Sequence, residues 1–80
     1  MSKIKFTLEE TLNELNITKN KLAVESKIRS NTIIDMVTNQ TKSIKLITLI
    51  DILDTLNRLG KEQGLNRTFD VDDVFIYLKK

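Results

Sequence analysis

The side chains in this chain that could do chemistry are amines, guanidinium groups, amides and carboxylates, because the sequence contains no histidine and no cysteine. Thiolate and imidazole nucleophiles are excluded, and zinc would find only carboxylate ligands, so we expect neither a metal site nor a cofactor. There is no glycine-rich phosphate loop, and 80 residues leave little room for a substrate pocket beside a core. An enzyme is therefore disfavoured, and the remaining chemistry is that of binding.

Positive charge is concentrated in the middle of the chain, although the net charge of the whole chain is only +2. Residues 18–45 carry six basic and two acidic side chains, a net charge of +4. Residues 1–17 have two basic against three acidic side chains and residues 46–80 have five against six, so each segment has a net charge of −1. The central cations are Lys19, Lys21, Lys27, Arg29, Lys42 and Lys45. A polyanionic partner and a solvated face without a partner explain this distribution equally well.

The central cations lie on a pattern that predicts two short helices joined by a tight turn. Thr18 is expected to cap a helix over about residues 19–26, and the next helix covers about residues 30–38. Apolar residues recur at helical spacing, at Leu22, Ala23, Ile28, Ile33 and Met36. This layout suits a helix-turn-helix, in which the first helix braces the unit and the second enters the major groove of DNA.

Two further helices are expected on either side of this unit. Residues 7–10 (T-L-E-E) form a capping-box pattern before a helix over about residues 8–16. A longer helix over about residues 45–59 has leucines at core spacing, at Leu46, Leu49, Leu53 and Leu56. Gly60 and Gly64 mark a break after it, in keeping with the use of glycine at helix ends.

The C-terminal segment is expected to form a fifth helix. Asp70 is placed to cap it, and it would cover about residues 70–78. Residues 4–6 and 68–69 could pair as short extended segments, although so few residues are weak evidence for strands. The sequence therefore predicts a single all-α domain over residues 1–80.

Five sequence motifs occur in a characteristic order and spacing. They are I-T-K-N-K-L-A at 17–23, I-R-S-N-T-I at 28–33, N-Q-T-K-S-I at 39–44, L-I-T-L-I-D-I-L-D-T-L at 46–56 and F-D-V-D-D-V-F-I-Y-L at 69–78. With these motifs nearly the whole chain, from about Lys5 to Tyr77, resembles the Cro and phage-repressor (XRE-type) helix-turn-helix family. The resemblance implies a five-helix, lambda-repressor-like bundle. It also implies a transcriptional regulator that binds a double-stranded DNA operator as a homodimer.

The resemblance implies roles for particular residues. The groove-facing positions of the recognition helix would be Ser30, Asn31, Ile34 and Asp35. Asn31 can make a bidentate contact to adenine, Asp35 can accept a hydrogen bond from a cytosine amino group, and Ile34 could meet a thymine methyl group. Contacts to the DNA backbone would come from residues near the turn and from the loop after the recognition helix, namely Lys19, Lys21, Lys27, Arg29, Asn39, Gln40, Thr41 and Lys42.

Several residues of the predicted helix-turn-helix depart from the usual family pattern. Lys27 stands at the turn where glycine is usual, which costs about 1 kcal/mol if its backbone is left-handed and adds a cation near the DNA. Arg29 replaces the usual Ser or Thr cap, so Ser30 is an alternative cap. Asp35 lowers the affinity for DNA unless it meets a cytosine. Ile34 fits a thymine contact, and it fits partial burial or a dimer contact equally well.

The helix expected over residues 45–59 is apolar around more than half of its circumference, which is wider than one core requires. Ile47 and Ile50 occupy positions where the family commonly has charged or polar residues. They could pack within the chain, where residues 57–68 look like an insertion, or they could form an interface with a second subunit. We favour the intramolecular core for both isoleucines and keep the interface as the alternative.

Two functions follow from these features. The favoured one is a sequence-specific DNA-binding transcriptional regulator, of the phage or prophage repressor type, with residues 30–38 in the major groove. The alternative is a helix-turn-helix-derived modulator, such as an anti-repressor or co-regulator, that binds another regulatory protein and has little DNA binding of its own. No apolar run approaches the ~20 residues of a membrane span, and the N-terminus lacks a signal-peptide core. We therefore expect a cytoplasmic, nucleoid-associated protein with no membrane partner.

Overall fold

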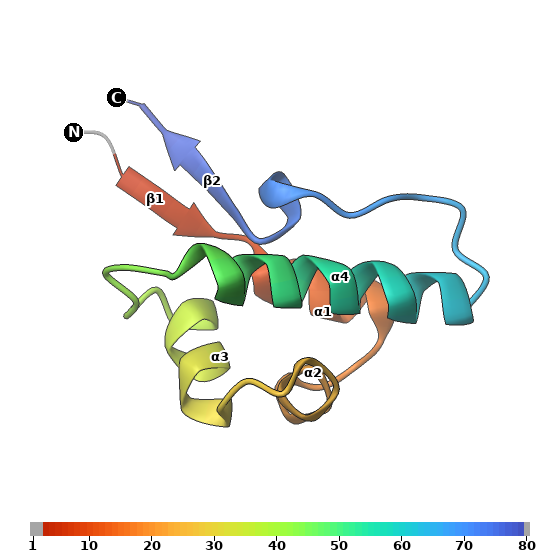
Figure 1. The fold of residues 1–80 in the computed structure, drawn as a ribbon. Helices are drawn as coiled ribbons and strands as arrows, with labels where there is room; N and C mark the ends of the chain where they lie inside the picture. The colour runs from red at the N-terminus through yellow and green to blue at the C-terminus, as the bar shows by residue number, and fades with distance from the viewer. Residues whose placement is uncertain (1–2, 80) are drawn as a thin grey trace.

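The computed structural model describes residues 3–79, which form four α-helices, one short 3-10 helix and a two-stranded antiparallel sheet. In chain order the elements are β1 (Lys3–Phe6), α1 (Leu8–Leu15), α2 (Lys19–Ser26), α3 (Ser30–Val37), α4 (Leu46–Glu62), the 3-10 helix η1 (Val71–Asp73) and β2 (Phe75–Leu78). Figure 1 shows the helices as one body from which the two strands extend side by side. The fold of these residues is mixed α/β, so the expected all-α, five-helix lambda-repressor-like bundle is wrong.

The helix expected over residues 70–78 is replaced by a turn and a strand. Asp70 does act as a cap, but only for one turn of 3-10 helix. Its carboxylate accepts a hydrogen bond from the backbone N–H of Asp72 at 3.1 Å, and the carboxylate of Asp73 accepts one from the backbone N–H of Asp70 at 2.9 Å. The following run F-I-Y-L has two aromatic residues and one β-branched residue, which favour strands, and it pairs with β1.

The two strands pair over four residues each. The register runs from Lys3 opposite Leu78 to Phe6 opposite Phe75, and the rings of this last pair meet edge to face with centroids 5.8 Å apart. An extended segment at residues 4–6 was one of the options left open by the sequence, and it is present. Its partner is β2 and not residues 68–69, because β2 offers the longer run of strand-forming side chains.

All four α-helices end in the same backbone motif. A residue just past each helix has a left-handed backbone with φ between 56° and 76°. Asn16 and Lys27 directly follow α1 and α2, whereas Asn39 and Gly64 lie two residues after the ends of α3 and α4. At the end of α2, for example, the N–H of Lys27 bonds the carbonyl of Val24 at 3.3 Å and the N–H of Ile28 bonds the carbonyl of Ala23 at 3.0 Å. These bonds satisfy carbonyl groups that a helix end leaves unpaired, so each break in the helical pattern is also a stabilised turn.

Two details at the helix ends differ from expectation. The side chain of Thr7 does not cap α1, because its hydroxyl donates to the carbonyl of Asp72 at 2.7 Å and so ties α1 to the 3-10 helix. Helix α4 continues past Gly60, which the sequence suggested as its end. A Cβ atom at Gly60 would lie 2.9 Å from the ring of Phe69, so this glycine is required for close packing. Gly64, with φ of 76°, provides the stop.

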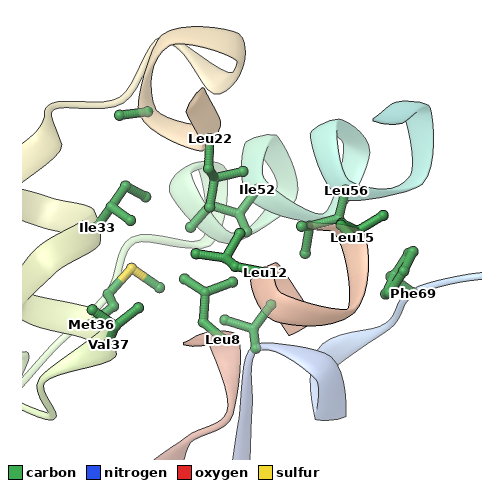
Figure 2. Packing of buried hydrophobic residues seen from close by; sticks show 12 residues of the cluster. Leu8, Leu12, Leu15, Leu22, Ile33, Met36, Val37, Ile52, Leu56 and Phe69 are labelled. Atoms are coloured by element: carbon green, nitrogen blue, oxygen red, sulfur yellow. The ribbon is translucent and has the colours of Figure 1, made fainter. Parts of the chain in front are cut away.

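The core is formed by the inward faces of the four helices together with Phe69 and Val74 (Figure 2). Its largest fully buried side chains are Phe69, Leu8, Leu15, Leu22, Ile33, Met36, Ile52, Leu56 and Val74. On α4 the buried face is centred on Ile52, Leu56 and Leu59. Of the leucine row that the sequence suggested, Leu56 is fully buried, and Leu49 and Leu53 are partly buried against the core. Leu46, the first leucine of that row, is 76% exposed.

Residues 57–68 are the last turns of α4 followed by a connection that is pinned to the core. The side-chain amide of Asn57 donates to the carbonyl of Phe69 at 3.0 Å and accepts from its N–H at 2.7 Å. The side chain of Gln63 donates to the carbonyl of Leu15 at 2.6 Å. The two Asn57 bonds hold Phe69 against α4, and the Gln63 bond ties the end of α4 to α1. Among the described residues, no helix is both long and apolar enough to cross a membrane.

Candidate nucleic-acid interface

Helices α2 and α3 pack against each other and are joined by the tight turn that the sequence predicted (Figure 1). The Thr18 hydroxyl caps α2 by accepting from the N–H of Lys21 at 3.0 Å, as expected. At the other end, the buried hydroxyl of Ser26 donates to the carbonyl of Leu22 at 2.6 Å, so no polar atom there is left unpaired. Lys27 then turns the chain with a left-handed backbone, and α3 begins three residues later.

The outward face of α3 gathers the four predicted base-reading residues. Ser30, Asn31, Ile34 and Asp35 are all exposed, and their spacing places them on one side of the helix. The opposite side, with Ile33, Met36 and Val37, is buried in the core. Tight packing of one face therefore fixes the rotation of α3 and presents the other face to solvent.

The structure shows that Arg29, and not Ser30, takes the cap position at the start of α3. Arg29 is the residue before the helix, with an extended backbone, and its side chain makes no capping bond. The carbonyl of Arg29 accepts from the N–H groups of Thr32 and Ile33, at 3.0 and 3.4 Å. Ser30 is already the first helical residue and does not take the cap position, so its hydroxyl lies on the exposed surface beside Asn31.

Two of the predicted backbone-binding cations are engaged in surface ion pairs. The amine of Lys19 lies 3.8 Å from the carboxylate of Glu9, and the amine of Lys21 lies 3.6 Å from that of Glu25. Exposed pairs of this kind contribute about 0–1 kcal/mol, so an incoming phosphate could exchange for the carboxylate at little cost. Lys27, like these two lysines, is exposed on the α2 side of the turn.

The loop after α3 contains the remaining predicted contact residues, and one of them has a structural task. The side-chain oxygen of Asn39 accepts from the N–H of Phe6 in β1 at 3.0 Å, so the loop is attached to the sheet. Gln40 is exposed, and its N–H closes the end of α3 by bonding the carbonyl of Asp35 at 2.8 Å. Thr41 and Lys42 line a small hollow of about 160 Å³ between this loop and the sheet.

Sequence reasoning did not find the contact that joins Asn39 to Phe6, because it links positions 33 residues apart. A local signal was present, since Asn tolerates the left-handed backbone that ends a helix and is the second choice after glycine there. The loop position of Asn39 was therefore predictable, whereas its partner required the sheet.

A second contact that the sequence did not reveal fixes α2 to α4. The guanidinium of Arg58 donates to the carboxylate of Glu25 at 2.9 Å and to that of Glu62 at 3.3 Å. The hydrogen bond from Arg58, with the positive charge of Lys21 nearby, lowers the pKa of the Glu25 carboxyl below its ordinary value of 4.5. The same hydrogen bond raises the pKa of Arg58. The position of α2 on α4 is thus set by charge as well as by packing.

Three apolar side chains on the outer face of α4 remain exposed. Leu46 is 76% exposed, Ile47 62% and Ile50 51%. The interpretation of Ile47 and Ile50 as core residues is therefore wrong, because the buried face of α4 lies on its other side. Residues 57–68 do not cover them either. These three residues, called the α4 stripe below, are an apolar surface without a partner in the described part of the chain.

A hollow of about 730 Å³ lies between the C-terminal half of α4 and residues 65–68. Its lining includes Arg58 and Arg67, but both guanidinium groups are already bonded to carboxylates. Arg67 also stacks on the ring of Phe69, with its guanidinium carbon 4.3 Å from the centroid. These arginines link elements of the fold, and their side chains remain 46% and 39% exposed.

The surface of α2, α3 and the loop thus combines polar, methyl-bearing and cationic groups on a rigid support. The described residues contain no group of three or more His, Cys, Asp or Glu side chains that could hold a metal ion. Comparison with family models, with curated proteins and with solved structures found no match. The candidate site therefore rests on the geometry of this chain alone.

Proposed function

We propose that this protein is a sequence-specific DNA-binding transcriptional regulator that docks α3 in the major groove. The observation that carries the proposal is the exposed face of α3, where Ser30, Asn31, Ile34 and Asp35 stand together on a helix whose other face is locked in the core. An α-helix with its side chains is about 10–12 Å across, which matches the ~12 Å width of the major groove. The resemblance to phage repressors supports the same function.

The chemistry of the α3 face suits base edges. Asn31 can donate to and accept from adenine with its amide, and Ile34 offers an apolar surface to a thymine methyl group. Asp35 accepts only, so it suits the amino group of a cytosine and is repelled by phosphates. A site that satisfies all three groups contains an adenine, a thymine and a cytosine within a few base pairs.

The cations around α3 supply attraction to the DNA backbone. Residues 18–45 carry a net charge of +4, and Lys19 and Lys21 belong to the first turn of α2. Lys27, Arg29 and Lys42 are exposed around α3 and its following loop. Phosphate contacts of this kind position a protein on DNA without specifying sequence. A nucleoid-associated, cytoplasmic location belongs to this proposal.

Selection of bound sequences from randomised DNA tests the proposal. The wild-type chain is expected to enrich one motif, and Asn31→Ala to relax the preference at one adenine with a loss of about 1–3 kcal/mol on the selected site. Lys19→Ala is the matched control, because it should weaken binding to all sequences and lower the salt slope by about one without changing the motif. Enrichment of no motif by the wild-type chain would contradict the proposal.

A second function is favoured by one specific observation, the exposed α4 stripe, together with Ile34 at 42% exposed. Apolar surface of this extent suits a protein partner, so the alternative is a modulator that binds another regulatory protein and has little DNA binding of its own. Titration with genomic DNA fragments distinguishes the two. Salt-dependent binding favours the regulator, and its absence, with co-purification of a second protein, favours the modulator.

A further inference from the structure

We propose that the hollow between the loop after α3 and the two-stranded sheet binds a small aromatic carboxylate. The hollow measures about 160 Å³, and its loop is the green segment that joins α3 to α4 in Figure 1. That loop belongs to the surface that the proposed function places on DNA, so any effect of the ligand on DNA binding rests on that function. Binding of the carboxylate itself is measured without DNA, and the two can therefore fail separately.

The floor of the hollow is apolar and held in place by the core. Phe6 and Phe75 lie opposite each other in the sheet, with their rings edge to face, and Ile4 is on the same face of β1 as Phe6. Ile44 adds an aliphatic side chain from the loop. Phe6, Ile44 and Phe75 also pack against the core, so a ligand would not have to order them. An aromatic ring suits a floor of this kind.

The rim of the hollow is polar and carries one positive charge. Of the eight described residues that line the hollow, Lys42 alone is charged, so no lining carboxylate opposes an anion. Lys42 is exposed, and it has no ion-pair partner in the part of the chain that the structure describes. In this it differs from Lys19 and Lys21, whose amines already lie beside carboxylates. The amine of Lys42 is therefore free to pair with a ligand.

The loop also supplies hydrogen-bond donors without partners. Within residues 3–79, no described hydrogen bond uses the backbone N–H groups of residues 41–44 or the hydroxyl groups of Thr41 and Ser43. The loop is nevertheless held at both ends. Asn39 accepts from the N–H of Phe6 at 3.0 Å, and the carbonyl of Lys45 accepts from the first turn of α4 at 3.1 Å. Several donors beside a cation suit a carboxylate, which accepts on both oxygens.

The size of the hollow limits the ligand. Sites for drug-sized molecules enclose about 300–1,000 Å³, so this smaller hollow suits a single ring with one carboxylate. An inorganic anion would leave the apolar floor uncovered, and a neutral ring would leave Lys42 unpaired. Benzoate is the simplest probe that carries both groups. We expect a dissociation constant of about 0.1–1 mM, because so small a ligand makes few contacts.

An NMR titration of the wild-type chain tests the site with three probes. Benzoate should shift the amide signals of residues 41–44 and of Phe6, and the shifts should saturate. Benzamide keeps the ring without the charge, and acetate keeps the charge without the ring. Each should bind at least about tenfold more weakly than benzoate, since each lacks one of the two matching groups.

Three variants test the residues that carry the proposal. Lys42→Gln should weaken benzoate binding at least about tenfold and leave benzamide binding unchanged. Lys45→Gln is the matched control, because Lys45 is an exposed cation of the same loop that does not line the hollow, and its variant should bind like the wild type. Ile4→Ala should weaken both benzoate and benzamide, since it removes part of the floor. Ile4 is 49% exposed, so this variant is expected to fold, and circular dichroism checks all three.

The effect on DNA follows from Lys42, which the proposed function places on the phosphate backbone. A carboxylate bound at Lys42 neutralises that cation, so saturating benzoate should weaken DNA binding by about threefold to tenfold. The Lys42→Gln variant should bind DNA more weakly than the wild type and should not respond to benzoate. Sodium chloride at the same ionic strength is the control for screening.

Two outcomes would overturn the site. One is an absence of saturable shifts with benzoate up to about 10 mM, and the other is equal benzoate affinity in the wild type and in Lys42→Gln. If benzoate failed to bind but the chain selected one DNA motif, the proposed function would stand without this site. If benzoate bound as described but no DNA motif were selected, the site would stand and the DNA-binding proposal would fail.

Discussion

Lys27 combines a backbone cost with an exposed charge that the proposed DNA binding would use. Its φ of 60° places a residue with a β-carbon in the left-handed region, where glycine has no penalty. The other helix ends of this chain use Asn or Gly at the corresponding position, so Lys27 is the exception. Its ammonium group is exposed beside α3, which gives a physical reason for a lysine where the turn alone would favour glycine.

Replacing Lys27 by glycine should separate these two effects. We expect Lys27→Gly to raise the free energy of unfolding by about 0.5–1 kcal/mol, because the left-handed backbone no longer crowds a side chain. The affinity for DNA should fall, with a salt slope lower by about one. Urea unfolding and anisotropy titrations measure the two quantities. Lys27→Ala is the control, since it loses the charge and keeps the strain, and a gain in stability for alanine equal to that of glycine would contradict this explanation.

Glu25 is the residue at which pH should act on the join between α2 and α4. Its pKa is lowered because Arg58 donates a hydrogen bond to it and Lys21 lies nearby. A lowered folded-state pKa means that the ionised carboxylate contributes stability above its ordinary value of 4.5. That contribution is lost as the pH falls through the folded-state pKa.

An NMR titration of the Glu25 carboxyl tests this electrostatic join directly. The pKa measured in the wild-type chain should lie below 4.5, and Arg58→Met should raise it towards that value. Arg67→Met is the matched control, because Arg67 bonds Glu14 and Asp73 and should leave Glu25 unchanged. An unaltered Glu25 pKa in the Arg58 variant would show that the hydrogen bond does not form in solution.

At the scale of elements, α4 depends on a glycine in its interior. Ala normally stabilises a helix interior relative to Gly by about 1 kcal/mol. At Gly60, however, the added Cβ would lie 2.9 Å from a ring carbon of Phe69, which is only 2% exposed and held by Asn57. We expect Gly60→Ala to lower the free energy of unfolding by about 1–3 kcal/mol, measured by urea unfolding.

A neighbouring position provides the control for Gly60. Lys61 is exposed on the same turn of α4, so Lys61→Ala should change the stability by less than about 0.5 kcal/mol. A Gly60→Ala variant as stable as the wild type, or more stable, would mean that Phe69 does not pack against this part of α4.

The elements differ in how far the sequence determined them. The bounds of α1, α2 and α3 were predictable to within a residue, because short helices with breaks at Asn16, Lys27 and Asn39 depend on local signals. The C-terminal strand was not, because Asp70 is a true helix-start signal that is overridden one turn later. What overrides it is pairing with β1, about 70 residues away in sequence, and no local pattern contains that information.

In the candidate site too, features set by local sequence were predictable and features set by distant contacts were not. The exposed face of α3 was predictable, since the buried residues at Ile33, Met36 and Val37 leave only one side for Asn31 and Asp35. The hydrogen bond from Phe6 to Asn39 and the exposure of Ile47 depend on the register of other elements. Periodicity could show that α4 has more apolar surface than one core needs, but it could not show which apolar residues the core would take.

At the scale of the whole molecule, three regions have separate tasks. The α2–α3 unit and its following loop carry the positive charge, and the sheet formed by the two ends of the described chain is attached to that loop through Asn39 (Figure 1). The α4 stripe lies at the other end of the same loop, after Lys45.

Sequence-specific binding of DNA by this protein is best measured in an anisotropy titration of the wild-type chain with two duplexes at several salt concentrations. One duplex carries the sequence selected from randomised DNA, and the other has the same bases in shuffled order. The account predicts that the selected duplex binds at least about a thousandfold more tightly and that both affinities fall with added salt. Equal binding of the two duplexes, or no salt-dependent binding to either, would contradict it.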